Sequence, residues 1–149
     1  MELTDLYREV ILDHNRHPRN FGRLEPHDAH ADGHNPLCGD RLSITLRRDG
    51  DMLEDLRFEG QGCAISVASA SMMTEAVTGT SVAEALDLAA AFRGMMAGEV
   101  EPEEDRFGDL VALKGVVKYP IRIKCAVLAW DVLQEALSGD GEAGATHDH

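Results

Sequence analysis

The chain has 149 residues and a mass of 16.2 kDa, which suits one domain with its own hydrophobic core. Its 14 basic and 27 acidic residues give a net charge of −13. This charge argues against nonspecific binding to nucleic acid or to an anionic membrane surface, because both need a basic protein face.

The sequence also carries no targeting or membrane signal that we can identify. It lacks an apolar run of the roughly 18 residues that a membrane-spanning helix needs, and residues 1–5 do not have the layout of a signal peptide. We therefore expect a cytoplasmic protein. In a reducing compartment, three widely separated cysteines indicate metal or redox chemistry and not a disulfide framework.

The spacing of apolar residues predicts the secondary structure in chain order. The predicted elements are a helix over 3–15, a long loop or irregular edge over 19–37, a strand over 42–46 that turns at 49–50 into a second strand through 56–58, and helices over 64–78, 81–96, 110–115 and 121–138. The acidic segment 97–109 is predicted to be a solvated linker. A hairpin followed by helices predicts an α+β fold, with a single domain over residues 1–138 and a disordered tail over 139–149.

The three cysteines lie at positions that favour chemistry. Cys63 follows a glycine at the start of a predicted helix, where backbone N–H groups favour a thiolate. Cys38 also stands next to a glycine, in the turn before the first strand. Cys125 has two basic neighbours, Arg122 and Lys124. The alternative is that each cysteine packs as a small hydrophobic residue, and this alternative is strongest for Cys125 on its apolar helical face.

Asp40, two residues after Cys38, could supply an oxygen ligand beside the cysteines. Three thiolates and one carboxylate suit tetrahedral zinc, and Arg122 and Lys124 could offset the negative charge of such a site. An iron–sulfur cluster would accept the same soft ligands, and no Cys-x-x-Cys pair selects between them. The simplest alternative for Asp40 is a turn residue that bonds its own backbone.

The histidines form a rival candidate cluster. His27, His30 and His34 lie within the irregular segment, and His14 lies on the first predicted helix. Their spacing is not that of a known metal motif, so we interpret them as surface or loop-packing residues.

Six short motifs follow one another along the chain, and their order and separation are more specific for a protein family than any one motif alone. They occupy residues 7–14, 18–20, 35–40, 60–66, 68–73 and 120–130. With these motifs, residues 2–138 resemble the U-type iron–sulfur scaffold superfamily, and within it the SufU-type zinc-dependent sulfurtransferases.

Two features place the resemblance in the SufU-type branch. Lys124 stands immediately before the last cysteine, where IscU-type scaffolds have a histidine. SufU-type proteins also carry an insertion between their second and third cysteines, and residues 79–109 fit that insertion.

The resemblance implies a compact α+β scaffold in which a small antiparallel sheet is covered by helices. It further implies a zinc ion as cofactor and a SufS-type, pyridoxal-phosphate-dependent cysteine desulfurase as partner. The sulfur acceptor would be Cys38, and Arg122 is a candidate for docking or for freeing a ligand at the interface. The implied zinc ligands are Cys38, Asp40, Cys63 and Cys125.

Two other functions remain open at this point. The first is a scaffold for a transient [2Fe–2S] cluster held by the same ligands, which Lys124 disfavours because a protonated lysine is a poor ligand. The second is a partner that only activates the desulfurase. If the protein is a sulfur acceptor, its sulfur would pass to a downstream iron–sulfur assembly complex.

Overall fold

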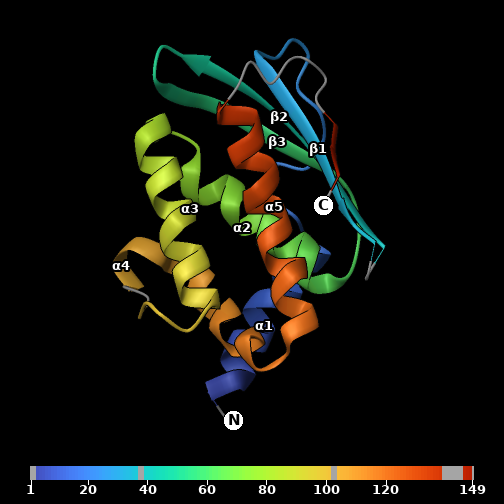
Figure 1. The fold of residues 1–149 in the computed structure, drawn as a ribbon, viewed down its shortest axis with the longest axis vertical. Helices are drawn as coiled ribbons and strands as arrows, with labels where there is room; N and C mark the ends of the chain where they lie inside the picture. Colours follow the sequence, from blue (N-terminus) through green and yellow to red (C-terminus); the bar gives the residue numbers. More distant parts are fainter. Residues whose placement is uncertain (1–2, 37–38, 102–103, 139–145, 149) are drawn as a thin grey trace.

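A computed structural model describes residues 3–36, 39–101, 104–138 and 146–148. Three long antiparallel strands and a short fourth form a sheet in the order β3-β2-β1-β4, and the helices lie against one of its faces (Figure 1). The elements are α1 (Leu3–Arg16), β1 (Ala29–Asn35), β2 (Asp40–Asp49), β3 (Met52–Gln61), α2 (Ala64–Val77), α3 (Val82–Met96), α4 (Glu104–Phe107), the 3-10 helix η1 (Gly108–Lys118), α5 (Pro120–Ser138) and β4 (Thr146–Asp148). The predicted α+β class is confirmed.

The central hairpin forms where the sequence predicts it. Strands β2 and β3 pair in antiparallel register, with Ile44 opposite Phe58 and Leu46 opposite Leu56. These four side chains are fully buried, as their alternation predicts. The hairpin therefore supplies the sheet side of the core.

The prediction of a loop over residues 19–37 is wrong for its last part, which forms strand β1 beside β2. The inward residues of β1 are Ala29, Ala31 and Gly33, which lack the bulk and β-branching that signal a strand. The small side chains have a packing reason. A Cβ atom placed on Gly33 would lie 2.6 Å from Val132 Cγ2 of α5, so this helix approaches the strand closely.

The predicted helices over 64–78, 81–96 and 121–138 are confirmed as α2, α3 and α5. Helix α3 begins at the predicted capping box. Its Ser81 Oγ accepts the Glu84 N–H at 3.0 Å, and Glu84 Oε1 accepts the Ser81 N–H at 2.9 Å. Helix α5 begins at Pro120, because proline suits the first turn, where its missing N–H costs nothing.

The segment 97–109 is only partly the solvated linker that its acidic composition predicts. Its end forms α4 and the start of η1, and Phe107 is buried there. The burial of this aromatic side chain anchors the end of a segment otherwise rich in acids. The short helix predicted over 110–115 is longer in the structure and is a 3-10 helix.

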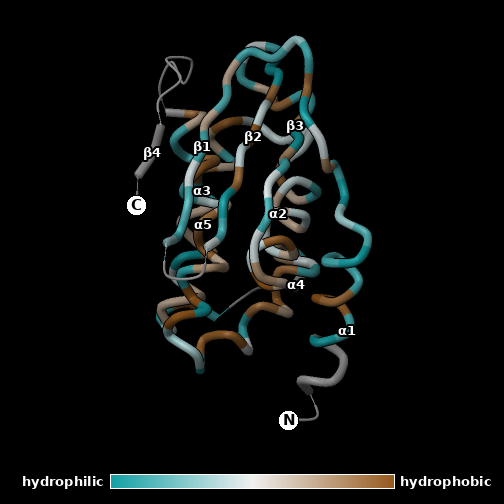
Figure 2. Tube along the Cα trace, turned by 90° about the vertical axis from the view of Figure 1, so that its right-hand side faces the viewer, coloured by the Kyte–Doolittle hydropathy of each residue, from teal (hydrophilic) through white to brown (hydrophobic). Residues whose placement is uncertain are grey.

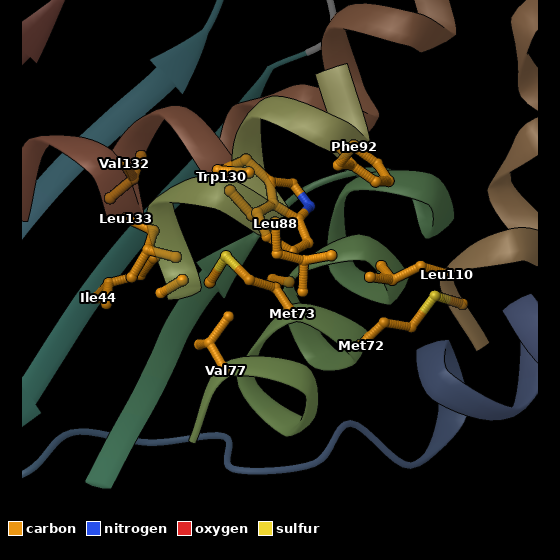
Figure 3. Packing of buried hydrophobic residues seen from close by; sticks show 14 of the residues in the cluster. Ile44, Met72, Met73, Val77, Leu88, Phe92, Leu110, Trp130, Val132 and Leu133 are labelled. Carbon is orange, nitrogen blue, oxygen red and sulfur yellow. The ribbon is translucent and has the colours of Figure 1, made fainter. Parts of the chain in front are cut away.

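The core fills the space between the sheet and the helices (Figure 3). Trp130 of α5 stacks on Phe92 of α3, with ring centroids 4.9 Å apart. Met73 of α2 is fully buried in the same cluster, as expected of a core-filling methionine. In Figure 2 the hydrophobic stretches lie mainly in the helices behind the strands. Helix α5 packs on β1 and β2 and also contacts α2 and α3, so it is the central helix of the fold.

The tail expected to be disordered, residues 139–149, lies mostly outside the described residues. Its described part, β4, pairs in parallel with β1, with Gly33 opposite His147. The expectation of disorder is wrong for these three residues. The outer edge of β1 presents backbone N–H and C=O groups, and a short strand can pair with them. Within the described part of the chain, no helix combines the length and apolar character that a membrane crossing requires.

The close approach of β1 and α5 gives a test of the packing. We expect Gly33→Ala to lower the free energy of unfolding by about 1–3 kcal/mol, because the added Cβ overlaps Val132. In urea unfolding, Gly33→Ala combined with Val132→Ala should be less destabilised than the sum of the two single variants. Gly115→Ala is the control, since a Cβ there meets no atom within 4 Å. Strict additivity of the pair would contradict the proposed overlap.

Candidate metal centre

Three of the four predicted ligands come together where three elements begin. Asp40 is the first residue of β2, Cys63 is the N-cap of α2, and Cys125 lies in the first turns of α5. One ligand atom from each residue lies within 4.8 Å of the other two. Cys38, the fourth predicted ligand, lies outside the described residues.

Asp40 carries the most informative geometry of the group. It is fully buried, and its Oδ1 accepts the backbone N–H of Cys63 at 2.8 Å. Its Oδ2 is buried without a hydrogen-bond partner. The alternative for Asp40 was a turn residue that bonds its own backbone. This bond differs from that alternative, because its donor is the N–H of Cys63 at the start of α2. A buried carboxylate oxygen without a partner is costly, and a bound cation would remove that cost.

Two glycines allow the chain to bring Cys63 beside Asp40. Gly60 has φ +142°, and a Cβ there would overlap the carbonyl oxygen of Arg41. A Cβ on Gly62 would lie 2.5 Å from Asp40 Oδ1. Only a residue without a side chain permits these approaches, so the glycines of the 60–66 motif serve the geometry of the centre.

Cys125 is buried, and its Sγ lies 3.7 Å from the carbonyl oxygen of Ile121 in the preceding turn. The side-chain Nδ2 of Asn35, at the end of β1, donates to the same sulfur over 3.9 Å. Asn35 is not among the site residues predicted from the sequence. Its place in the motif over 35–40, three residues before Cys38, is the signal that could have indicated it.

Arg122 is exposed and lies against the sulfur atoms. The negative charge of Cys63 and a hydrogen bond to Cys125 raise the pKa of Arg122 above its ordinary value. Lys124 takes a different direction and lines a separate cavity of about 490 Å³ with His34 and Asp131. Of the two basic residues proposed to offset the charge of the site, only Arg122 is therefore shown beside the sulfurs.

The interpretation of the histidines as surface or loop-packing residues, and not as metal ligands, holds for part of the group. His27 and His30 contact each other edge to face, with ring centroids 5.4 Å apart. Among the described residues, neither these two nor His34 belongs to a group with metal-ligand spacing. His14 differs from the expected surface position, since it is fully buried between helices.

The centre opens to one side. Cys63 lines a cavity of about 940 Å³, whose rim includes Tyr119, Ile121 and Arg122. Tyr119 and Ile121 are 58% and 59% exposed, so they present apolar surface at the rim of this cavity. A second macromolecule could therefore approach the sulfur atoms from this side.

The donor set fits a metal ion. Zinc takes thiolate sulfur and carboxylate oxygen in a tetrahedral arrangement. Cys63, Cys125 and the unpaired Asp40 oxygen supply three such donors, and Cys38 is close in sequence. Iron in a cluster accepts the same donors, so the residues alone select a soft or borderline metal and not a particular one.

Comparison with known proteins identifies the family of the chain. The model of the NifU-like N-terminal domain family matches residues 6–126. The chain is 47% identical to the zinc-dependent sulfurtransferase SufU of Bacillus subtilis, over 91% of this chain and 92% of that protein. It is 44% identical to the iron–sulfur cluster assembly scaffold protein IscU of Streptococcus pyogenes, over 95% and 89% of the two chains.

Solved structures give the same result. The N-terminal part of a nitrogen-fixing NifU-like protein from Brucella abortus superposes with a TM-score of 0.83 at 27% identity. The match covers 97% of this chain and 100% of that one. The resemblance found in the sequence is therefore confirmed at the level of the family. Its motifs, its fold and its matched residues show that the chain belongs to the NifU-like N-terminal domain family of iron–sulfur cluster scaffold proteins.

Proposed function

We propose that the protein is a zinc-dependent sulfur acceptor, which takes persulfide sulfur from a cysteine desulfurase for iron–sulfur cluster assembly. The observation that carries this proposal is the buried, unpaired Oδ2 of Asp40 beside Cys63 and Cys125. The name of the Bacillus subtilis relative supports the zinc and the sulfur transfer. The insertion and Lys124 support the same branch.

The zinc ligands in this proposal are Cys38, Asp40, Cys63 and Cys125. When bound, zinc holds its thiol ligands deprotonated at neutral pH and ties folding to the metal. Asp40 takes part in two ways, because one oxygen fixes the Cys63 backbone and the other is free for the metal.

Cys38 is the sulfur acceptor in this mechanism. Cys125 is buried within a helix, and Cys63 is tied to Asp40 through its backbone. The Cys38 thiolate attacks the terminal sulfur of the desulfurase persulfide, and a new S–S bond forms on Cys38. The old S–S bond breaks, and the desulfurase thiolate leaves with the electron pair. The step is an exchange and needs no external oxidant or reductant.

The desulfurase would dock on the rim of the open cavity. Tyr119 and Ile121 offer apolar surface there, and Arg122 offers a positive charge in a chain of net charge −13. A partner of the SufS type would place its persulfide beside Cys63, for transfer of the terminal sulfur to Cys38. An iron–sulfur assembly complex would then receive the sulfur.

The second candidate function is a scaffold for a transient [2Fe–2S] cluster, and the name of the Streptococcus pyogenes relative favours it. The described geometry adds an argument against it. Lys124 lines the cavity with His34 and Asp131, and so does not replace the histidine ligand of IscU-type scaffolds. Metal and acid-labile sulfide in anaerobically purified protein distinguish the two functions. About one zinc per chain without sulfide supports the acceptor, whereas iron and sulfide in equal amounts would establish the scaffold.

We expect Cys38→Ala to abolish sulfur acceptance while the protein stays folded and binds zinc more weakly, because three ligands remain. Transfer of labelled sulfur from a desulfurase to the chain measures acceptance, and a thermal melt measures folding. Stimulation of the desulfurase that survives in this variant, without transfer, would instead identify the protein as an activator. Normal transfer to Cys38→Ala would refute the acceptor role.

Cys125→Ala should lose zinc and, with it, the zinc-dependent part of the stability. At a free zinc concentration about 1,000 times the dissociation constant, wild-type protein should gain about 4 kcal/mol over its metal-free form. The variant should gain far less, since a buried ligand of the cysteine centre is missing. Unfolding in urea with and without zinc measures both gains. An equal gain in the two proteins would place the metal elsewhere.

A further inference from the structure

A second group of metal-ligating side chains lies where α1, α2 and η1 meet. His14, Glu75 and Asp109 each place a ligand atom within 4.8 Å of the other two. Glu75 lies about 18 Å along α2 from Cys63 at 1.5 Å per residue, so this group is separate from the cysteine centre. We propose that it binds a divalent first-row transition-metal ion of the zinc type.

The imidazole of His14 is held in the orientation that a ligand needs. The ring is fully buried, and its Nδ1 lies 2.7 Å from Ser71 Oγ. The same Ser71 oxygen accepts the backbone N–H of Arg19 at 2.9 Å. Metal-binding histidines usually have their second ring nitrogen fixed by a hydrogen bond of this kind. The remaining nitrogen, Nε2, faces the two carboxylates.

The distances fit an ion between these atoms. Nε2 lies 2.9 Å from Asp109 Oδ2 and 4.0 Å from Glu75 Oε1. Neighbouring ligand atoms in a tetrahedral zinc site are about 3.3 Å apart, given bonds of about 2.0–2.1 Å. The two observed distances lie on either side of this value. Glu75 and Asp109 are 49% and 56% exposed, so small rotations of their side chains can equalise the distances and leave a position open to water.

Binding replaces a proton with the ion. In the structure His14 Nε2 and Asp109 Oδ2 share a hydrogen bond. On binding, the neutral ring changes tautomer. Nε2 gives its proton to solvent and Nδ1 takes one up from solvent, so that Nδ1–H donates to Ser71 Oγ. Two carboxylates and a neutral imidazole carry a charge of −2, which a divalent ion neutralises. The mixed nitrogen and oxygen donors suit zinc, iron(II) or manganese better than calcium or magnesium.

Arg19, a cation that interacts electrostatically with Glu75 and Asp109, makes its hydrogen bonds to other residues. The Arg19 guanidinium donates to Asp13 Oδ2 at 2.6 Å and to the His17 carbonyl at 3.0 Å. The bond to Asp13 is the main reason that the pKa of Arg19 is raised, and the charges of Glu75 and Asp109 contribute less.

The same side chains also form an Asp–His–Ser chain, which in a hydrolase would activate the serine. Ser71 is fully buried and its oxygen already accepts a backbone N–H, so a substrate cannot reach it. The carboxylate side of His14 is the accessible side, and that favours a metal ligand over a nucleophilic serine.

The test is a Co²⁺ titration of the metal-free, reduced full chain. Thiolate-bound cobalt gives a strong near-ultraviolet charge-transfer band, and cobalt on nitrogen and oxygen ligands gives only weak visible bands. We expect two bound ions, one of each kind. Glu75→Gln and Asp109→Asn should each weaken the second ion at least about tenfold and leave the thiolate band unchanged. Both variants keep an oxygen that can accept the His14 N–H, so the metal-free melt should barely move.

Glu54→Gln is the matched control, because it removes one exposed carboxylate from β3, away from the cluster, and should keep both ions. The tail histidines, His147 and His149, are present in every variant. A second ion that persists in Glu75→Gln and Asp109→Asn, or that never binds, would overturn the proposal. Failure of the proposed function would appear separately, as loss of the thiolate-bound ion.

Discussion

The hydrogen bond from the Cys63 backbone to Asp40 Oδ1 joins the two halves of the metal centre. It ties the start of β2 to the start of α2, which are separated along the chain by the whole central hairpin. The bond can form only because Gly62 has no side chain to collide with the carboxylate. It also uses one carboxylate oxygen and leaves the other buried and unpaired. The fold thus holds a buried carboxylate oxygen beside two sulfur atoms. This arrangement is costly without a cation, and the burial of hydrophobic side chains elsewhere must offset that cost.

Helix α5 supplies the rigid side of that centre. Trp130 is buried against Phe92, and the close contact of Val132 with Gly33 sets the helix on β1. Cys125 lies on the same helix and is buried with it, so its sulfur has little freedom to move. A centre with one immobile thiol and one backbone-anchored thiol suits the proposed mechanism, in which Cys38 is the sulfur acceptor.

The sequence predicts those parts of the fold whose residues alternate or cap in the usual way. The hairpin, the capping box at Ser81 and helix α5 all follow from local pattern. Strand β1 could not be predicted in this way, because Ala31 and Gly33 are chosen to fit a helix of the remote C-terminal region and carry no local strand signal. The burial of Phe107 could not be predicted for a similar reason, because the core cluster that it joins is built from elements distant in sequence.

The site shows the same limit. Cysteines and an aspartate are conspicuous in a sequence, and three of them do converge. His14 was interpreted as a surface or loop-packing residue and not as a ligand, because the spacing of the histidines matches no metal motif, yet its partners come from α2 and from η1. Ligands brought together only by packing of distant helices leave no spacing to recognise. Helix α2 therefore has a group of donor atoms near each end. The acidic segment 97–109 is more than a solvated linker, because its last residue, Asp109 at the start of η1, bonds the buried His14.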